Sequence, residues 1–106
     1  KNMLLGPNGQ NIYPEEIEDK LSNMTLVNEC LVVQRDNKLV GLVYPDQEQI
    51  KNLNLSESDI ESIMEQNRKE VNPTLPSYAQ LISIKVMDKE FEKTPKKSIK
   101  RFLYQN

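Results

Sequence analysis

Apolar runs that are too short to form helices recur along the chain, and their composition predicts β-strands. Runs rich in β-branched residues at 30–34 and 39–44 flank a turn that contains Asp36 and Asn37, which predicts an antiparallel hairpin at the centre of a sheet. Apolar and polar residues then alternate over 82–86, as they do in a half-buried strand. Near the start of the chain, the turn sequence GPNG separates two shorter apolar stretches and predicts a small N-terminal β-hairpin.

Two further segments carry apolar residues at helical spacing. The first helix is predicted over 14–23, because Pro14 suits the first turn of a helix and acidic residues follow it. The second is predicted over about 56–70, where Ser56 and Asp59 have the spacing of a capping box. The whole pattern predicts an α+β fold, in which a small, antiparallel-rich β-sheet with an N-terminal β-hairpin packs against these two main helices.

The length and composition of the chain restrict its class of function. A chain of 106 residues suits one compact domain over 1–106, which is too small to enclose a roomy active-site cleft with walls of its own. No apolar run approaches the roughly 18 residues that a membrane-spanning helix needs. We therefore predict a cytoplasmic protein with no transmembrane segment, and leave open a peripheral position at the inner face of the membrane.

Histidine and cysteine, the usual ligands of zinc, are nearly absent from the chain. The chain has no histidine and one cysteine, Cys30, which excludes an internal disulfide, a zinc site and a Cys/His catalytic pair. Cys30 lies within an apolar run and is expected to be buried. No metal site is predicted in this domain.

Charge is distributed unevenly along the chain, although the net charge is only −2. Residues 1–92 carry nine basic and sixteen acidic residues, whereas 93–106 carry five basic residues and no acidic one. A nucleic-acid module would be expected to spread Lys and Arg over a whole face and to interleave stacking aromatics. Because the body of this chain is acidic, we expect no nucleic-acid partner, and the basic segment at the end requires another explanation.

Two motifs at opposite ends of the chain supply a resemblance. They read GQNIYPEEIE near the start and LPSYAQLISIKVMDKEFEKTPKKSIKR near the end. In this order they resemble the small C-terminal domain of the AMP-forming adenylating enzymes, and most closely that of bacterial long-chain fatty acid–CoA ligases. The resemblance covers nearly the whole chain, and 46–70 is its least diagnostic part.

The resemblance implies a role in a two-step reaction. In such a ligase, a fatty acid attacks ATP to give acyl-AMP and pyrophosphate, and the thiol of CoA then displaces AMP to give acyl-CoA. The small domain would be a mobile lid that rotates between the two steps, next to its own large N-terminal domain that holds the nucleotide and acyl pockets. ATP and CoA are thus the expected substrates of the full-length enzyme. Mg is expected with ATP in the large domain, and no cofactor is expected in this domain alone, which we predict to be inactive when isolated.

The same resemblance implies roles for residues near the start of the chain. Lys1 resembles the hinge residue about which the small domain pivots. Gly9, Gln10 and Asn11 resemble the hairpin loop that lies against the pantetheine arm of CoA during thioester formation. A glycine is useful there because the missing Cβ lets a ligand approach the main chain, although a simple turn glycine would look the same.

The basic segment near the end departs from the family pattern at one position. The pattern reads Thr, two small residues, Gly, Lys, an aliphatic residue, any residue and Arg. Thr94, Ile99 and Arg101 resemble its members. That register places Lys97 at the usual glycine and Ser98 at the usual lysine, which in the family reaches the α-phosphate and the attacking carboxylate.

A substitute for the missing lysine is therefore needed if the loop is catalytic. A serine hydroxyl donates one hydrogen bond but brings no charge to offset the repulsion between two anions. The adjacent Lys97 is the first candidate to replace it, and Lys96 is a weaker one. Thr94, Lys100 and Arg101 complete the basic loop without a separate catalytic role.

Two alternatives remain open at the level of sequence. The basic loop could be a surface loop that contacts only solvent and acidic neighbours. The chain as a whole could be a non-catalytic α+β interaction module, whose basic C-terminal tail binds phosphorylated or nucleic-acid partners.

Overall fold

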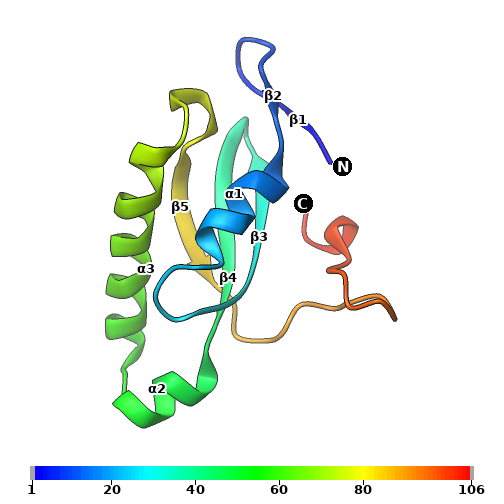
Figure 1. Ribbon diagram of the computed structural model, residues 1–106. Helices are drawn as coiled ribbons and strands as arrows, with labels where there is room; N and C mark the ends of the chain where they lie inside the picture. The colour runs from blue at the N-terminus through cyan, green and yellow to red at the C-terminus, as the bar shows by residue number, and fades with distance from the viewer. Residues whose placement is uncertain (1, 106) are drawn as a thin grey trace.

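The computed structural model of the chain describes residues 2–105 and shows helices packed on a small sheet (Figure 1). The α+β class predicted from the sequence is confirmed. In chain order, the helices and strands are β1 (Leu4–Leu5), β2 (Asn11–Ile12), α1 (Pro14–Leu21), β3 (Val27–Arg35), β4 (Lys38–Pro45), α2 (Gln47–Leu53), α3 (Glu57–Val71) and β5 (Leu81–Val86). Short 3₁₀ turns lie at Asn72–Thr74, Ser77–Ala79 and Arg101–Leu103.

The main sheet is mixed, with the strand order β3-β4-β5. β3 and β4 run antiparallel, with Val32 opposite Gly41, whereas β4 and β5 run parallel, with Gly41 opposite Ile84. A parallel pair needs a long crossover connection, and the chain through α2 and α3 provides it. The predicted hairpin of β3 and β4 is present, but only β4 is central. The expectation that both strands lie at the centre is wrong for β3, which is an edge strand.

The turn between β3 and β4 has the conformation that its residues favour. Asp36 has a φ of 53° and Asn37 a φ of 62°, so both central residues are left-handed, as in a type I′ hairpin turn. Asp and Asn tolerate this region better than most residues. The turn fixes the register of the hairpin, in which Arg35 lies opposite Lys38.

The two predicted helices are present with slightly different ends. α1 ends at Leu21, two residues before the predicted end. α3 begins after the expected capping box, in which the Ser56 hydroxyl accepts a hydrogen bond from the Asp59 amide at 3.1 Å and the Asp59 carboxylate accepts one from the Ser56 amide at 2.9 Å. The seven-residue α2 was not predicted; it buries no side chain, so no apolar stripe marks it in the sequence.

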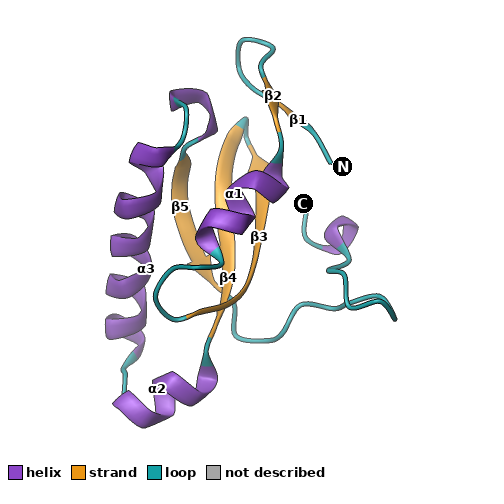
Figure 2. Cartoon of the chain, in the orientation of Figure 1, coloured by secondary structure: helices purple, strands orange, loops and turns teal. Residues whose placement is uncertain are grey.

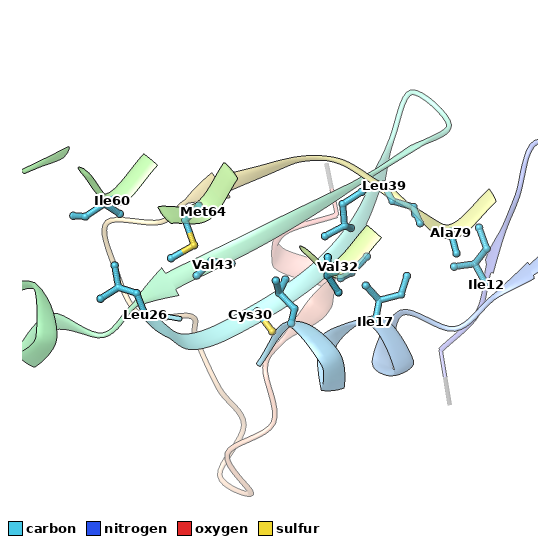
Figure 3. Packing of buried hydrophobic residues seen from close by; sticks show 13 residues of the cluster. Ile12, Ile17, Leu26, Cys30, Val32, Leu39, Val43, Ile60, Met64 and Ala79 are labelled. Carbon is cyan, nitrogen blue, oxygen red and sulfur yellow. The ribbon is translucent and has the colours of Figure 1, made fainter. Parts of the chain in front are cut away.

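The larger core lies between one face of the sheet and the helices α1 and α3 (Figure 3). Ile17 and Leu21 of α1 and Met64 of α3 enter this core and are almost fully buried. Cys30 belongs to it as well, which confirms the expected burial, and this burial raises the pKa of the Cys30 thiol to about 12. The thiol is therefore an apolar core group at neutral pH.

The opposite face of the sheet is covered by the chain after β5. We call residues 87–104 the C-terminal segment; most of it is drawn as loop in Figure 2. Phe91 of this segment is buried with Leu31, Val33 and Leu42 of the sheet. The ring of Tyr104 packs edge-on against Phe91, with 5.0 Å between ring centroids. The C-terminal segment, which includes the basic residues, is therefore attached to the domain by a second, smaller core.

Candidate functional site: a cationic loop

We call residues 93–101 the basic loop. These residues form a tight turn around Thr94. Lys93 and Ile99 pair as an antiparallel bridge at its base. The Lys97 amide donates to the Thr94 carbonyl at 2.8 Å, and the Thr94 amide donates to the Ser98 carbonyl at 2.8 Å. The Thr94 hydroxyl accepts a further bond from the Ser98 amide at 3.2 Å. Because Thr94 forms hydrogen bonds through both its backbone and its side chain, it fixes the shape of the loop.

Lys97 has an unusual backbone conformation at the tip of this turn. Its φ is 67°, in the left-handed region that glycine adopts without steric cost and that is uncommon for other residues. The turn therefore holds a lysine in a backbone conformation that glycine would adopt more easily. Ser98 follows directly, and its side chain is exposed.

The cations of the loop fall into two groups. Lys96, Lys97 and Lys100 form no ion pair with any residue of the described range 2–105. Lys97 and Lys100 line an open hollow of about 800 Å³, together with Thr94, Ser98, Arg101 and the carboxylates of Glu15 and Glu18, which lie beside Arg101. Lys96 is exposed and lies outside this lining. Two unpaired ammonium groups beside an open hollow can bind an anionic ligand.

Lys93 and Arg101, in contrast, are held by carboxylates of the domain body. Lys93 Nζ lies 2.5 Å from Glu29 Oε2 on β3, and hydrogen bonding to Glu29 raises the pKa of Lys93. Arg101 Nη1 donates to Glu18 Oε2 on α1 at 2.9 Å, and Nη2 donates to Glu18 Oε1. These pairs fasten the two sides of the loop to different elements.

The carboxylates of α1 differ in their surroundings. Burial raises the pKa of Glu18, against the opposing effect of hydrogen bonds from Arg101 and Val32. For Glu15, burial also acts to raise the pKa, but hydrogen bonds from Asn2 and the charge of Arg101 lower it to about 2. The Asn2 amide and side chain both donate to Glu15 Oε2, at 3.0 and 2.7 Å. Glu15 therefore stays ionised at neutral pH.

The N-terminal hairpin carries the other set of expected site residues. Gly9 has a φ of 81°, and an added Cβ would meet nothing within 4 Å, so the backbone conformation alone accounts for the glycine. Gln10 is half-buried and its side chain accepts from the Asn8 amide at 3.0 Å, whereas Asn11 is exposed. Figure 1 shows this hairpin and the basic loop at well-separated places on the domain. Lys1, the expected hinge, lies outside the described residues.

Sequence reasoning did not identify the carboxylates that anchor the loop. Glu18 lies 83 residues from Arg101, and a sequence offers no signal for a pair so far apart beyond the opposite charges of the two motifs. No membrane-spanning helix occurs among residues 2–105. In the same range, His, Cys, Asp and Glu side chains form no group of three that could hold a metal ion.

The fold and the loop define a small α+β domain that presents a cationic turn at one place and a glycine-containing hairpin at another. The chain belongs to the AMP-binding enzyme C-terminal domain family, whose sequence profile matches residues 2–105. A search of curated proteins finds no match to this chain.

Solved structures share this fold at low sequence identity. The adenylation domain of a carboxylate reductase from Mycobacterium chelonae has a TM-score of 0.80 and is 17% identical, over 96% of this chain and 17% of that one. An acyl-CoA synthetase from Brucella canis has a TM-score of 0.74 and is 23% identical, over 96% and 18%. A fatty acyl CoA synthetase from Mycobacterium tuberculosis has a TM-score of 0.62 and is 19% identical, over 97% and 19%. This chain thus spans less than a fifth of each of those chains.

Proposed function

We propose that this domain is the mobile C-terminal lid of a long-chain fatty acid–CoA ligase, which makes acyl-CoA from ATP, a fatty acid and CoA through an acyl-adenylate. The family membership supports an adenylating enzyme, and the motifs quoted above, which resemble those of long-chain ligases, support the substrate class. The observation that carries the proposal is the basic loop itself. Its tight turn presents unpaired lysines beside an open hollow, as a site for phosphate and carboxylate groups requires.

In this proposal the chemistry needs a second domain. The hollow beside Lys97 is open on this domain, so walls that exclude water and hold ATP and the acyl chain must come from the large N-terminal domain. Lys97 would place its ammonium between the α-phosphate and the attacking carboxylate and reduce their mutual repulsion. ATP would bring its Mg in the large domain, and CoA would pass along Gly9, Gln10 and Asn11 in the second arrangement.

The full-length protein that carries this domain is expected to convert ATP, CoA and a long-chain fatty acid to AMP and acyl-CoA. The measurement is AMP and acyl-CoA formation over a panel of long-chain, short-chain, aromatic and dicarboxylic acids. The 106-residue domain alone is expected to give no turnover, because it lacks an enclosed pocket. Turnover by the isolated domain would contradict the lid, and a preference for another acid would contradict the substrate class.

We further propose that Lys1 is the hinge between the two arrangements. Replacing it with proline in the full-length protein would hold φ near about −65° and favour one arrangement. One half-reaction, either acyl-AMP formation or thioester formation from supplied acyl-AMP, is then expected to slow far more than the other. Equal loss in both half-reactions would count against a hinge at this position.

A further inference from the structure

The basic loop contacts the body of the domain through its ion pairs and through Ile99, which packs against the smaller core. Ile99 is only half-buried, and Phe102 and Leu103, which follow Arg101, are exposed. Lys97 forms no ion pair with residues 2–105 and lies four residues from Arg101. Arg101 is the loop residue that forms ion pairs with α1, so the position of the cationic tip relative to α1 depends on what holds Arg101.

We propose that Arg101 is a positioning residue for acyl-adenylate formation, because its ion pair with Glu18 fixes the basic loop at the place from which Lys97 acts. This inference rests on the proposed adenylating function. Arg101 does not contact the substrate in this proposal. It positions the loop, and the lysines of the loop contact the substrate.

The geometry of the pair is suited to fixing a position. Arg101 binds both oxygens of Glu18 in a bidentate arrangement, which sets the orientation of the guanidinium as well as its distance. The side chains are only 20% and 13% exposed, so water screens the pair weakly. Glu18 Oε2 also accepts the Val32 amide of the edge strand β3 at 2.8 Å. One carboxylate thus joins α1, the sheet and the loop.

Backbone hydrogen bonds carry this constraint from Arg101 to the tip. The Arg101 amide donates to the Ile99 carbonyl at 2.9 Å, and the Lys100 amide donates to the Glu92 carbonyl at 2.9 Å. Ile99 in turn pairs with Lys93 across the base of the loop. Movement of Arg101 would therefore move both sides of the turn that presents Lys97.

Glu15 adds a link between the loop and the start of the described chain. Arg101 Nη2 lies 4.0 Å from Glu15 Oε2, the oxygen that also accepts both hydrogen bonds from Asn2. The first turns of α1 therefore hold the residue next to the proposed hinge and the loop in one arrangement. If the domain rotates, the loop would turn with it as a rigid part.

The test compares half-reactions in the full-length protein. Arg101→Met removes the charge and keeps much of the side-chain volume, Arg101→Lys keeps the charge but loses the bidentate fork, and Glu18→Arg with Arg101→Glu exchanges the partners. Arg68→Met is the matched control, because Arg68 makes a similar bidentate pair with Glu65 on the surface of α3. Acyl-AMP formation is measured by pyrophosphate release. Thioester formation is measured as the acyl-CoA made from supplied acyl-AMP. Folding is measured by thermal unfolding.

For Arg101→Met, kcat for acyl-AMP formation is expected to fall about 100-fold, the order of loss that a misplacement of about 1 Å produces, while thioester formation stays near the wild-type rate. Arg101→Lys should lose less, the exchanged pair should recover part of the lost rate, and Arg68→Met should match the wild type in both steps. If Arg101→Met does not fold, Arg101→Lys and the exchanged pair decide by the same comparison.

Two results would overturn the positioning role. One is an equal fall in both half-reactions that follows the loss of thermal stability, which would make the pair purely structural. The other is unchanged acyl-AMP formation in a folded Arg101→Met protein. A wild-type protein that forms no acyl-AMP with any carboxylic acid would instead contradict the proposed function, so the two failures are distinguishable.

Discussion

Replacing Lys97 with alanine in the full-length protein is expected to slow acyl-AMP formation by about a thousandfold. An ammonium about 4 Å from a phosphate oxygen, at an effective dielectric constant of about 20, contributes on the order of 4 kcal/mol before desolvation, and each 1.36 kcal/mol corresponds to about tenfold in rate. Thioester formation from supplied acyl-AMP should stay nearly intact, because that step would use the N-terminal hairpin. The measurement is pyrophosphate release for the first step and acyl-CoA formation for the second.

Matched variants separate Lys97 from its neighbours. Lys96→Ala and Lys100→Ala should have much smaller effects, since each removes one unpaired cation of the same loop from a different place. Ser98→Lys places a lysine at the position where the resemblance puts the family lysine. If Lys97→Ala is harmless and Ser98→Lys raises the adenylation rate sharply, the loop is a degraded form of the family site. If none of these variants changes an active enzyme, the basic loop is not catalytic.

Leu21→Ala is expected to lower the free energy of unfolding of the 106-residue chain by about 2–5 kcal/mol, the range for a buried leucine that leaves a cavity. Leu21 is 0% exposed. It approaches the backbone of the central strand so closely that a Cβ at Gly41 would lie 3.2 Å from Leu21 Cδ2. Gly41 has no side chain that could move into the space that the leucine leaves. Urea unfolding followed by circular dichroism measures the change.

Leu53→Ala is the matched control for this loss. Leu53 is also a helical leucine but is 64% exposed, so its replacement should change the free energy of unfolding by about 0.5 kcal/mol or less. Similar losses for Leu21→Ala and Leu53→Ala would mean that helix propensity, and not the packing of α1 on β4, determines the effect.

The sequence predicts those parts of the fold that depend on neighbouring residues. The β3–β4 hairpin follows from Asp36 and Asn37, which accept left-handed backbone, and the start of α3 follows from the capping box of Ser56 and Asp59. The parallel pairing of β4 with β5 could not be predicted, because alternation of apolar and polar residues is the same for both strand directions. α2 was missed for a similar reason, since only Ile50 of this helix packs against the core and one residue makes no apolar periodicity.

The candidate site also has features that the sequence predicts and features that depend on the fold. The lysines of this short loop are visible in the sequence, but the left-handed backbone of Lys97 is not. The sequence could not show which cations remain unpaired, because that depends on carboxylates that only the fold brings near. Lys93 and Arg101 look like members of the same basic cluster as Lys97, yet Glu29 and Glu18 bind them.

The C-terminal segment covers the second face of the sheet. This cover has a consequence for synthesis of the chain on the ribosome. Leu31, Val33 and Leu42 are made about 50 to 70 residues before Phe91 and Tyr104, which cover them. Until then, one face of the nascent sheet stays open to solvent, and an open apolar sheet invites association with other chains. The residues that carry the cationic loop therefore also complete the domain, and its final closure must await the end of translation of this segment.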